Sequence, residues 1–345
     1  MTLSVCLIVK NEEKVIARCL DCVSQFADEI VVVDTGSVDN TISIARGFTD
    51  KVYEYKWCDD FSKARNFSFL QATSDYIMWI DSDDIVMEED IQKIKRLKKH
   101  LVADCYTMLY HVGYDSRGVP NFTFYRERII RRGSGVWRGF VHEYIEVKGN
   151  VFHTDIAIYH KKITSSGRRN LNIYRAHLKE GLSVRDTYYY ARELYYNGYY
   201  SSCIKNMKKF LKFATGGELV DGTVILSDCY LKRGDTGVAL RWLFKLLERE
   251  EPKGEVCCKI GEIMKKMGKL DCAVFWYKSA LLLTDEVRKG GFIRREFTGI
   301  VPALELTSIL YTLGKIEEAR EYHNLSKLIE PTHESVKFNE RFFKN

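Results

Sequence analysis

The sequence predicts an α/β domain over residues 1–165, followed by an all-α domain of helical repeats over residues 166–345. In the first half, continuous apolar runs alternate with helical patterns, which is typical of a parallel sheet covered by helices on both sides. After about residue 163 the pattern is helical to the end, and glycines recur at intervals. The length of 345 residues also fits two domains, because one domain takes roughly 150 residues.

Three segments of the first half are predicted to form buried parallel strands. They are Leu3–Val9, Glu29–Asp34 and Tyr76–Asp81, and each carries apolar residues on both faces. Helical patterns lie between and after them, at about residues 12–25, 39–46, 61–71 and 88–100. This alternation predicts a doubly wound, Rossmann-like sheet, whose ligands bind beyond the carboxyl ends of the strands.

A polar cluster follows each of these strands. The clusters are Lys10-Asn11, Asp34-Thr35-Gly36-Ser37 and Asp81-Ser82-Asp83-Asp84. Because the carboxyl ends of neighbouring parallel strands meet at one edge of a sheet, the clusters are expected to form one site. Residues 106–159 have a shorter, β-like pattern with many glycines, which predicts strands and loops that wall this site.

The acidic turn Asp81-Ser82-Asp83 carries the most specific chemistry. At the end of a strand the two carboxylates can converge on one cation. A hard divalent ion accepts such oxygen ligands and keeps further positions for diphosphate oxygens. The turn therefore predicts a metal site for a nucleotide diphosphate.

The helical half contains an internal repeat. Gly198, Gly234, Gly268 and Gly314 are each followed five positions later by a small residue, at Cys203, Ala239, Ala273 and Ala319. Glycine permits a tight turn between two helices, and the small residue lets the helices approach. The segments 267–277 and 313–319 resemble tetratricopeptide repeats, which stack into solenoids that bind extended peptides.

Charge and cysteine content narrow the class of protein. Residues 1–163 carry 22 basic and 24 acidic residues, which gives a net charge of −2. Residues 164–345 carry 31 basic and 23 acidic residues, which gives a net charge of +8. The ten cysteines are scattered, and Cys19 and Cys22 are expected to lie on one helix face. No apolar run reaches the roughly 18 residues of a membrane span. We expect a cytoplasmic protein with no integral membrane segment and no nucleic-acid partner.

Motifs of the first half resemble those of inverting family 2 glycosyltransferases of the GT-A fold. The matching stretches are Leu7–Glu13, Val32–Thr41, Asp60–Asn66 and Trp79–Asp84, with later landmarks at Val141-His142-Glu143 and Tyr159-His160. With its tetratricopeptide-like half, the whole chain resembles the glycocin S-glycosyltransferases, which modify bacteriocin precursor peptides.

The resemblance implies a site for a UDP-sugar. Asp34 would accept a hydrogen bond from the uracil N–H, with capping of a turn as its alternative role. Arg65 would approach the uracil or the diphosphate. Asp39 is expected to cap the helix that begins near Asn40. The other donor-binding residues implied are Val9, Lys10, Asn11, Glu13, Ser37, Asp81 and Ser82.

The resemblance also implies the metal ligands and the catalytic base. Asp81, Asp83 and His160 would hold Mn²⁺ or Mg²⁺. Inversion is an in-line displacement, so it needs a base opposite the leaving UDP. Glu143 is the first choice and His142 the alternative.

These features predict a metal-dependent inverting glycosyltransferase that moves a hexose from a UDP-sugar to a Cys or Ser of a peptide or protein. The helical repeats would bind the acceptor or form a homodimer. One alternative keeps the chemistry but replaces the acceptor by a cell-wall or lipid-linked glycan. Another is a peptide-binding adaptor with an inactive transferase domain.

Overall fold

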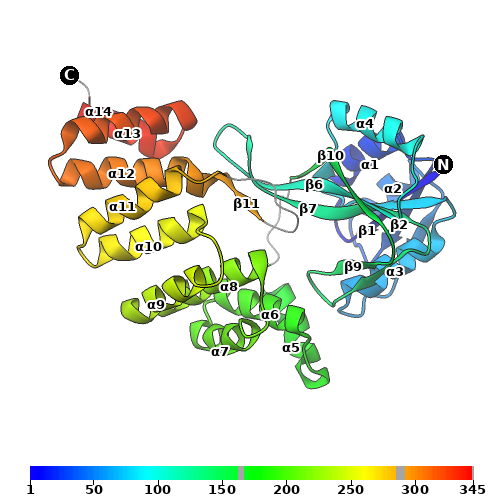
Figure 1. Ribbon diagram of the computed structural model, residues 1–345. Helices are drawn as coiled ribbons and strands as arrows, with labels where there is room; N and C mark the ends of the chain where they lie inside the picture. Colours follow the sequence, from blue (N-terminus) through cyan, green and yellow to red (C-terminus); the bar gives the residue numbers. More distant parts are fainter. Residues whose placement is uncertain (162–166, 285–291, 344–345) are drawn as a thin grey trace. The chain divides into compact units, whose positions relative to one another are not determined.

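The computed structural model describes residues 1–161, 167–284 and 292–343, and they form two units. Unit 1 comprises Met1–Val112 and Tyr125–Gly181, and unit 2 comprises Gly113–Phe124 and Leu182–Asn345. The predicted fold class, an α/β domain followed by a helical repeat region, is confirmed (Figure 1). The predicted domain boundary at residues 165–166 falls in the segment 162–166, which lies outside the described residues.

Unit 1 is built on a parallel sheet whose strands were predicted from the apolar runs. Strands β1 (Leu3–Val9), β2 (Glu29–Asp34), β3 (Val52–Glu54) and β4 (Tyr76–Trp79) pair in the order β3-β2-β1-β4. Strand β4 ends two residues before the predicted Asp81, because the chain then turns, with Asp84 N donating to Asp81 O at 3.0 Å. Val9 lies opposite Asp34, so the strands present their carboxyl ends at one edge.

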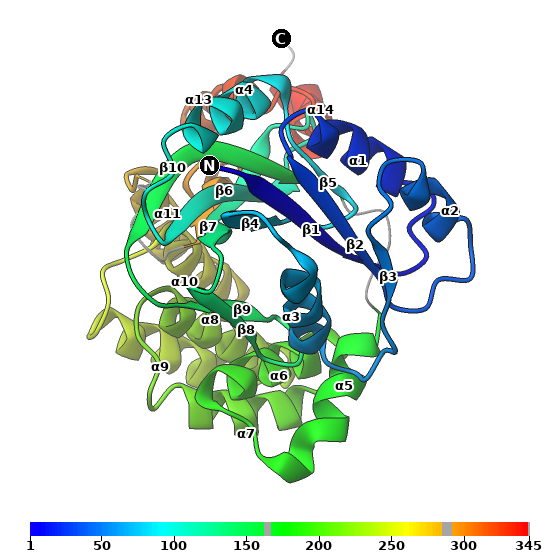
Figure 2. The ribbon, with the colours of Figure 1, turned by 90° about the vertical axis from the view of Figure 1, so that its right-hand side faces the viewer.

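Helices cover both faces of this sheet. Helix α3 (Phe61–Gln71) lies on one face, and α1 (Ile16–Ser24), α2 (Thr41–Arg46) and α4 (Glu88–Lys98) lie on the other (Figure 2). The range of α3 is the predicted one, and α1 begins later because residues after Glu12 first form a turn. The N-cap residue of α2 is Asn40, and the predicted cap Asp39 precedes it, with its Oδ1 accepting from Thr41 N at 3.0 Å.

Further strands, most of them where the β-like pattern predicted them, extend the sheet in antiparallel and parallel pairings. Strand β7 (Pro120–Arg131) pairs with β4, and the order continues through β6 (Cys105–Tyr114), β10 (Val151–His160) and β5 (Asp84–Ile85). A separate ribbon of β8 (Gly135–Arg138) and β9 (Tyr144–Val147) follows β7 in the chain. The two strands β6 and β7 run from unit 1 into the loop of unit 2 that joins them.

Unit 1 ends with α5 (Arg169–His177) and the 3₁₀ turn Leu178–Glu180. Unit 2 contains a row of antiparallel helices. They are α6 (Val184–Tyr196), α7 (Tyr200–Phe210), α8 (Gly216–Lys232), α9 (Thr236–Leu247), α10 (Gly254–Lys266), α11 (Leu270–Leu281), α12 (Ile300–Thr312), α13 (Ile316–Ile329) and α14 (Glu334–Phe343).

The predicted repeat corresponds to helix pairs α6/α7, α8/α9, α10/α11 and α12/α13. The repeating glycines lie in the turns within these pairs and have φ between 72° and 83°, where residues other than glycine are strained. The small residues five positions on, among them Cys203 and Ala273, are fully buried between the helices. The sequence repeat is therefore a structural repeat.

One repeat is longer than the others for a reason that the structure shows. Between α11 and α12 the chain forms the short strand β11 (Ile293–Arg294) and a 3₁₀ turn (Arg295–Thr298). Strand β11 pairs with β7 at Phe122 and Thr123, within unit 2. Arg294 also forms ion pairs with Asp221 of α8 and Glu255 of α10. This insertion lengthens the glycine spacing to 46 residues.

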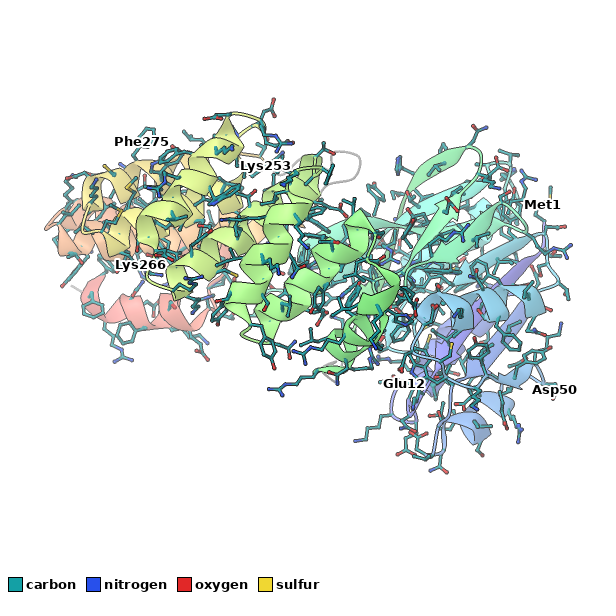
Figure 3. All side chains as sticks on the ribbon, turned by 90° about the horizontal axis from the view of Figure 1, so that it is seen from below. Met1, Glu12, Asp50, Lys253, Lys266 and Phe275 are labelled. Atoms are coloured by element: carbon teal, nitrogen blue, oxygen red, sulfur yellow. The ribbon has the colours of Figure 1, made fainter. Side chains whose placement is uncertain are left out.

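Other side chains point away from the helix pairs. Phe275 of α11 is 62% exposed, and Lys266 also lies on the outside (Figure 3).

Within the described residues, no helix combines the length and the apolar character that a membrane crossing requires.

Candidate active site

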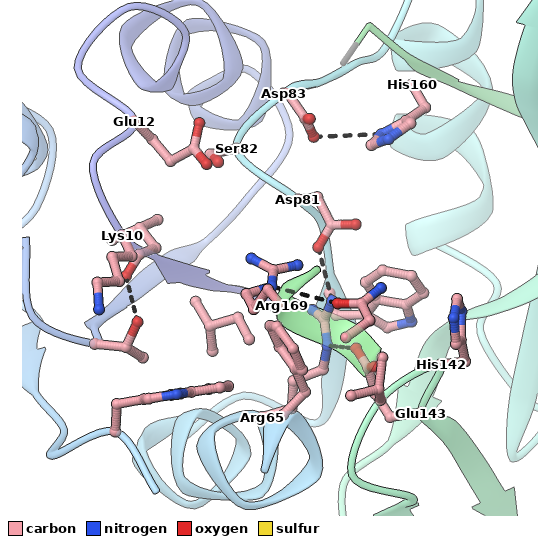
Figure 4. Close-up of a pocket in the computed structure, with 18 of the residues that line it drawn as sticks. Lys10, Glu12, Arg65, Asp81, Ser82, Asp83, His142, Glu143, His160 and Arg169 are labelled. Carbon is pink, nitrogen blue, oxygen red and sulfur yellow. Dashed lines mark hydrogen bonds and ion pairs between the residues drawn. The ribbon is translucent and has the colours of Figure 1, made fainter. Parts of the chain in front are cut away.

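A pocket of about 370 Å³ opens at the carboxyl edge of the parallel strands in unit 1 (Figure 4). It brings together many of the predicted site residues, which come from β1, α3, the turn after β4, β10 and the loop between β8 and β9. The predicted residues that line it are Val9, Lys10, Arg65, Asp81, Ser82, Asp83, His142, Glu143 and His160. Residues from all three strand-end clusters therefore line one pocket.

Other predicted donor residues lie in the two loops beside this pocket and bind the loops together. Ser37 Oγ accepts from Asn11 N at 2.8 Å, and Asn11 Oδ1 accepts from Val38 N at 2.8 Å. Glu13 Oε2 accepts from the main chain of Asn40 at 3.1 Å. Asn11 and Glu13 line a smaller hollow of about 140 Å³, which shares Glu12 and Asp83 with the main pocket.

Asp34 ends β2 and is only 2% exposed. Its Oδ2 accepts from the main-chain N–H groups of Gly36 (2.8 Å) and Ser37 (2.9 Å), which is the turn-capping alternative considered above. Its Oδ1 is buried and has no hydrogen-bond partner within the described chain. An orphaned carboxylate oxygen can accept one further donor.

The acidic turn lies against β10. Ligand atoms of Asp81, Asp83, Asp84 and His160 all lie within 4.8 Å of one another. Asp84 is fully buried and accepts bonds from Tyr110, Arg128 and the main chain of Asp81, so it faces the protein. Asp81, Asp83 and His160 line the pocket. Two carboxylates and an imidazole fit a divalent ion such as Mn²⁺.

The charges in this cluster shift each other's pKa values. Burial raises the pKa of Asp81, but the positive charges of Arg65 and Arg128 outweigh it and the net pKa is lowered. Burial lowers the pKa of His160, whereas hydrogen bonds to Asp83 and Asp84 raise it to about 10. A bound cation would therefore have to displace a proton from His160.

Arg65 is buried in the wall of the pocket and bridges two acids. Helix α3 starts at the N-cap Asp60, which accepts from Lys63 N, and this fixes the turn that carries Arg65. Nε donates to Glu143 Oε1 at 2.6 Å and Nη2 donates to Asp81 Oδ1 at 2.8 Å. The guanidinium lies 4.6 Å from the ring centroid of Trp79 and 4.8 Å from that of Trp137. Buried aromatic rings and two carboxylates thus fix its position.

Glu143 and His142 lie on the opposite side of Arg65 from the acidic turn. Glu143 is 9% exposed and lines the pocket, and Arg126 Nη2 donates to its main-chain oxygen at 3.1 Å. His142 has a φ of 54°, a left-handed conformation that is uncommon outside glycine. Such strain recurs at functional sites, where the surrounding structure maintains it.

The structure adds pocket residues that the sequence did not single out. They include Glu12, Trp57, Phe61, Tyr110, Arg126, Arg169 and Asn170. Burial and the neighbouring charge of Asp83 raise the pKa of Glu12. The sequence did offer a signal for Glu12, because it lies between the predicted donor-binding residues Asn11 and Glu13. For Arg126 and Arg169 the sequence offered no comparable signal.

The α/β sheet, its strand-end pocket and its acidic turn are the features that the sequence predicted for a glycosyltransferase. Comparison with known proteins agrees: residues 4–165 match the model of Glycosyl transferase family 2. This part of the chain is therefore a family 2 glycosyltransferase domain, and it is followed by a tetratricopeptide-like helical region.

Relatives cover the chain to different extents. The SPbeta prophage-derived glycosyltransferase SunS of Bacillus subtilis (strain 168) is 28% identical over 309 residues, which are 84% of this chain and 68% of SunS. A TPR repeat-containing protein of Synechococcus elongatus is 37% identical over 106 residues, 31% of this chain and 26% of that protein. The crystal structure of S. aureus TarS aligns with 18% identity and a TM-score of 0.40, over 69% of this chain and 54% of TarS.

Proposed function

We propose that this glycosyltransferase moves a hexose from a UDP-sugar, with inversion, to a cysteine or serine of a peptide or protein acceptor. The observation that carries the proposal is the single pocket in which Asp81, Asp83 and His160 face Arg65 and Glu143. Cation ligands, a fixed guanidinium and a carboxylate base are the groups that this displacement needs.

The proposed donor site lies at the ends of β1 and β2. The unpartnered Oδ1 of Asp34 supports its role as acceptor for the uracil N–H. Val9, Lys10 and Ser82 line the main pocket, where the nucleotide would lie. Asn11, Glu13 and Ser37 would contribute by holding the two loops in register, as their hydrogen bonds indicate.

Asp81, Asp83 and His160 would hold the divalent ion, Mn²⁺ or Mg²⁺. When bound, such an ion neutralises charge on the departing diphosphate. Arg65 is held between Asp81 and Glu143, so its charge lies between the proposed metal ligands and the proposed base. We propose that Arg65 stabilises the same developing charge.

We propose Glu143 as the base, with His142 as the alternative. The acceptor S–H or O–H loses its proton to the base while its sulfur or oxygen bonds to the anomeric carbon. The bond from that carbon to the diphosphate oxygen breaks, and UDP leaves with the electron pair. A cysteine needs less help from the base, because a thiol with a pKa near 8.5 is partly ionised at neutral pH.

Architecture supports a peptide acceptor. A family 2 domain followed by tetratricopeptide-like repeats resembles the glycocin S-glycosyltransferases, and the similarity to the glycosyltransferase SunS extends over most of the chain. We propose a bacteriocin precursor as the acceptor, bound in part by the helical repeats of residues 166–345. Homodimerisation through the terminal repeat and a cytoplasmic location remain predictions.

The proposal is tested by incubating the full chain with UDP- and GDP-sugars, MnCl₂ and peptides that carry a single Cys or Ser, and reading intact mass. One hexose on a peptide in the presence of a UDP-sugar supports the proposal. Transfer to lipid-linked or cell-wall glycans alone would support the second acceptor class instead. A chain that binds peptide but neither hydrolyses nor transfers any sugar would be an adaptor.

Asp83→Ala is expected to abolish donor hydrolysis and transfer while the fold persists, because it removes a proposed cation ligand that lines the pocket. Wild-type chain should gain thermal stability from UDP plus Mn²⁺, and the variant should not. Asp50→Ala, an exposed acid that does not line the pocket, is the matched control and should behave as wild type. Full activity of Asp83→Ala, or of the wild type in excess EDTA, would contradict the metal role.

A further inference from the structure

A charged pair that is fully buried lies directly behind the acidic turn. Arg128 of β7 and Asp84 both have no exposed surface, and Arg128 Nη1 donates to Asp84 Oδ2 at 3.2 Å. The same Nη1 donates to Trp79 O at 3.2 Å, at the end of β4. The guanidinium lies 3.7 Å from the ring centroid of Trp79 and 4.3 Å from that of Tyr110. Arg128 thus anchors Asp84 to the strand that leads into the turn.

Asp84 in turn contacts both halves of the proposed cation site. Its Oδ2 accepts from the main-chain N–H of Asp81 at 3.2 Å, which fixes the start of the turn. Its Oδ1 accepts from Tyr110 Oη at 2.9 Å and lies 3.0 Å from His160 Nδ1. The same Nδ1 lies 3.3 Å from Asp83 Oδ1. Tyr110 Oη also lies 2.8 Å from His160 Nδ1. One buried carboxylate therefore contacts the start of the turn and, together with Tyr110 and Asp83, holds one ring nitrogen of His160.

Stability alone does not explain this pair. Burying two charges has a desolvation cost that often equals or exceeds their attraction, and apolar residues of similar volume are frequently as stable. Arg128 also leaves Nε and Nη2 without hydrogen-bond partners among the described residues, which adds to the cost. Carboxylates behind a ligating histidine fix the orientation of its ring, and their loss weakens metal affinity by about 10–100-fold.

We propose that Asp84 and Arg128 are positioning residues, which hold His160 and the main chain of Asp81 in the arrangement that binds a divalent cation. Tyr110 completes the positioning through its hydroxyl group. The inference rests on the proposed metal dependence, and Asp84 and Arg128 lie outside the pocket lining.

The decisive experiment replaces both charges at once in the full chain. The double variant Asp84→Leu/Arg128→Met removes the buried pair without leaving one charge alone, so we expect its thermal stability to remain near that of wild type. Its Mn²⁺ affinity, measured by titration calorimetry without donor, should fall at least 10-fold. A double variant that is folded and binds Mn²⁺ like wild type would overturn the inference.

Single variants test the same inference if the double variant does not fold. Asp84→Asn and Tyr110→Phe conserve shape, and each should weaken Mn²⁺ binding while kcat recovers at saturating Mn²⁺. Arg128→Lys should lie between wild type and Asp84→Asn in affinity. Folded single variants with unchanged Mn²⁺ affinity, or activity that Mn²⁺ cannot restore, would likewise contradict a positioning role.

A matched control exists on the same strand. Arg131 of β7 donates to Asp104 Oδ1 at 3.1 Å, and neither residue lines the pocket. Asp104→Asn should leave Mn²⁺ affinity unchanged, and a loss equal to that of Asp84→Asn would contradict the inference. A wild type that transfers sugar but binds no Mn²⁺ would overturn both the metal role and this inference. Binding by the wild type with unaffected variants would overturn only the inference.

Discussion

At the scale of single residues, Arg65 links the two acidic groups of the pocket to which we assign different roles. Its guanidinium donates to Asp81 on one side and to Glu143 on the other, so the proposed metal ligand and the proposed base share one partner. Replacement of Glu143 by glutamine preserves an oxygen that can accept from Arg65 Nε but removes the capacity to take a proton. The Glu143→Gln variant can therefore distinguish an effect on UDP binding from an effect on proton transfer.

Glu143→Gln is therefore expected to bind UDP like wild type and to turn over about 100-fold or more slowly, since general bases contribute roughly 10²–10⁴-fold. The loss should be larger with a serine peptide than with a cysteine peptide, because the thiol is more acidic. UDP affinity and single-turnover rates on both peptides check this. Unchanged rates would remove Glu143 as the base and direct attention to His142.

Glu29 supplies a pH-dependent contribution to stability away from the pocket. Burial raises the pKa of Glu29, but bonds from Lys51, Ser4 and Thr73 outweigh it and lower the pKa from 4.5 to about 2. A carboxyl whose pKa is depressed by folding stabilises the protein above its unfolded pKa, and this contribution is lost as the pH falls towards its folded pKa.

Glu29→Gln should consequently lower the urea midpoint at pH 7, and the difference from wild type should shrink as the pH falls from about 4.5 to about 2. Chemical denaturation at several pH values measures it. A difference that is constant with pH would show that the bonds, and not the charge, carry the effect.

Single-residue roles could be predicted where they follow from motif position, and less well where they depend on turn geometry. Arg65, Asp83 and His160 lie together in the pocket as the motifs implied. Glu13 was predicted at the donor, whereas Glu12 lines the main pocket and Glu13 bonds to Asn40. Which of two adjacent acids faces the pocket depends on the left-handed turn at Asn11 (φ 56°), which the apolar pattern does not reveal.

At the scale of elements, local patterns were sufficient to predict β1, β2 and the helical repeat. Strands β1 and β2 have the predicted ranges because an unbroken apolar run is itself the signal of a strand buried on both faces. The repeat was visible because each pair of helices needs a glycine with positive φ in its turn. In contrast, the pairing of β11 with β7 joins residues about 170 positions apart, and no local sequence pattern predicts it.

The repeat turns give a prediction that separates backbone strain from crowding. Gly268 has φ 72°, and an added Cβ there would meet no atom within 4 Å. Gly268→Ala should thus cost about 1–2 kcal/mol of unfolding free energy from strain alone, and Gly268→Asn less, because Asn tolerates this conformation. Urea denaturation checks both. Equal losses for Ala and Asn would contradict the strain argument.

Gly261 of α10 is the matched comparison, since its φ is ordinary but a Cβ would lie 2.9 Å from the ring of Tyr277. Gly261→Ala should be destabilising through crowding, and Gly261→Asn more so. The order of Ala and Asn is therefore opposite at the two glycines.

At the scale of the whole molecule, neither unit is a continuous piece of chain. The loop Gly113–Phe124 between β6 and β7 belongs to unit 2, although both strands begin or end in unit 1. Its Phe122 and Phe124 contact Phe292 at ring-centroid distances of 5.9 and 5.6 Å, and Ser116 N donates to Glu330 at 2.8 Å. The loop therefore depends on residues that come much later in the sequence.

A fragment of residues 1–181 is expected to be poorly soluble, because it would expose Phe122 and Phe124 without their partners. The same fragment with residues 113–124 replaced by a short glycine-containing turn should be soluble and folded. Size-exclusion chromatography and thermal denaturation distinguish the two. Equal behaviour of both fragments would show that the loop does not need unit 2.

Strand β7 has a further consequence for chimeric enzymes. In this strand, Phe122 and Thr123 pair with β11. A few residues further on, Arg126 lines the pocket and Arg128 bonds to Asp84 of the acidic turn. An exchange of repeat arrays between relatives must therefore transplant residues 113–124 together with the helices. A graft that joins two parents at a single crossover after residue 181 would combine a loop from one parent with docking partners from the other.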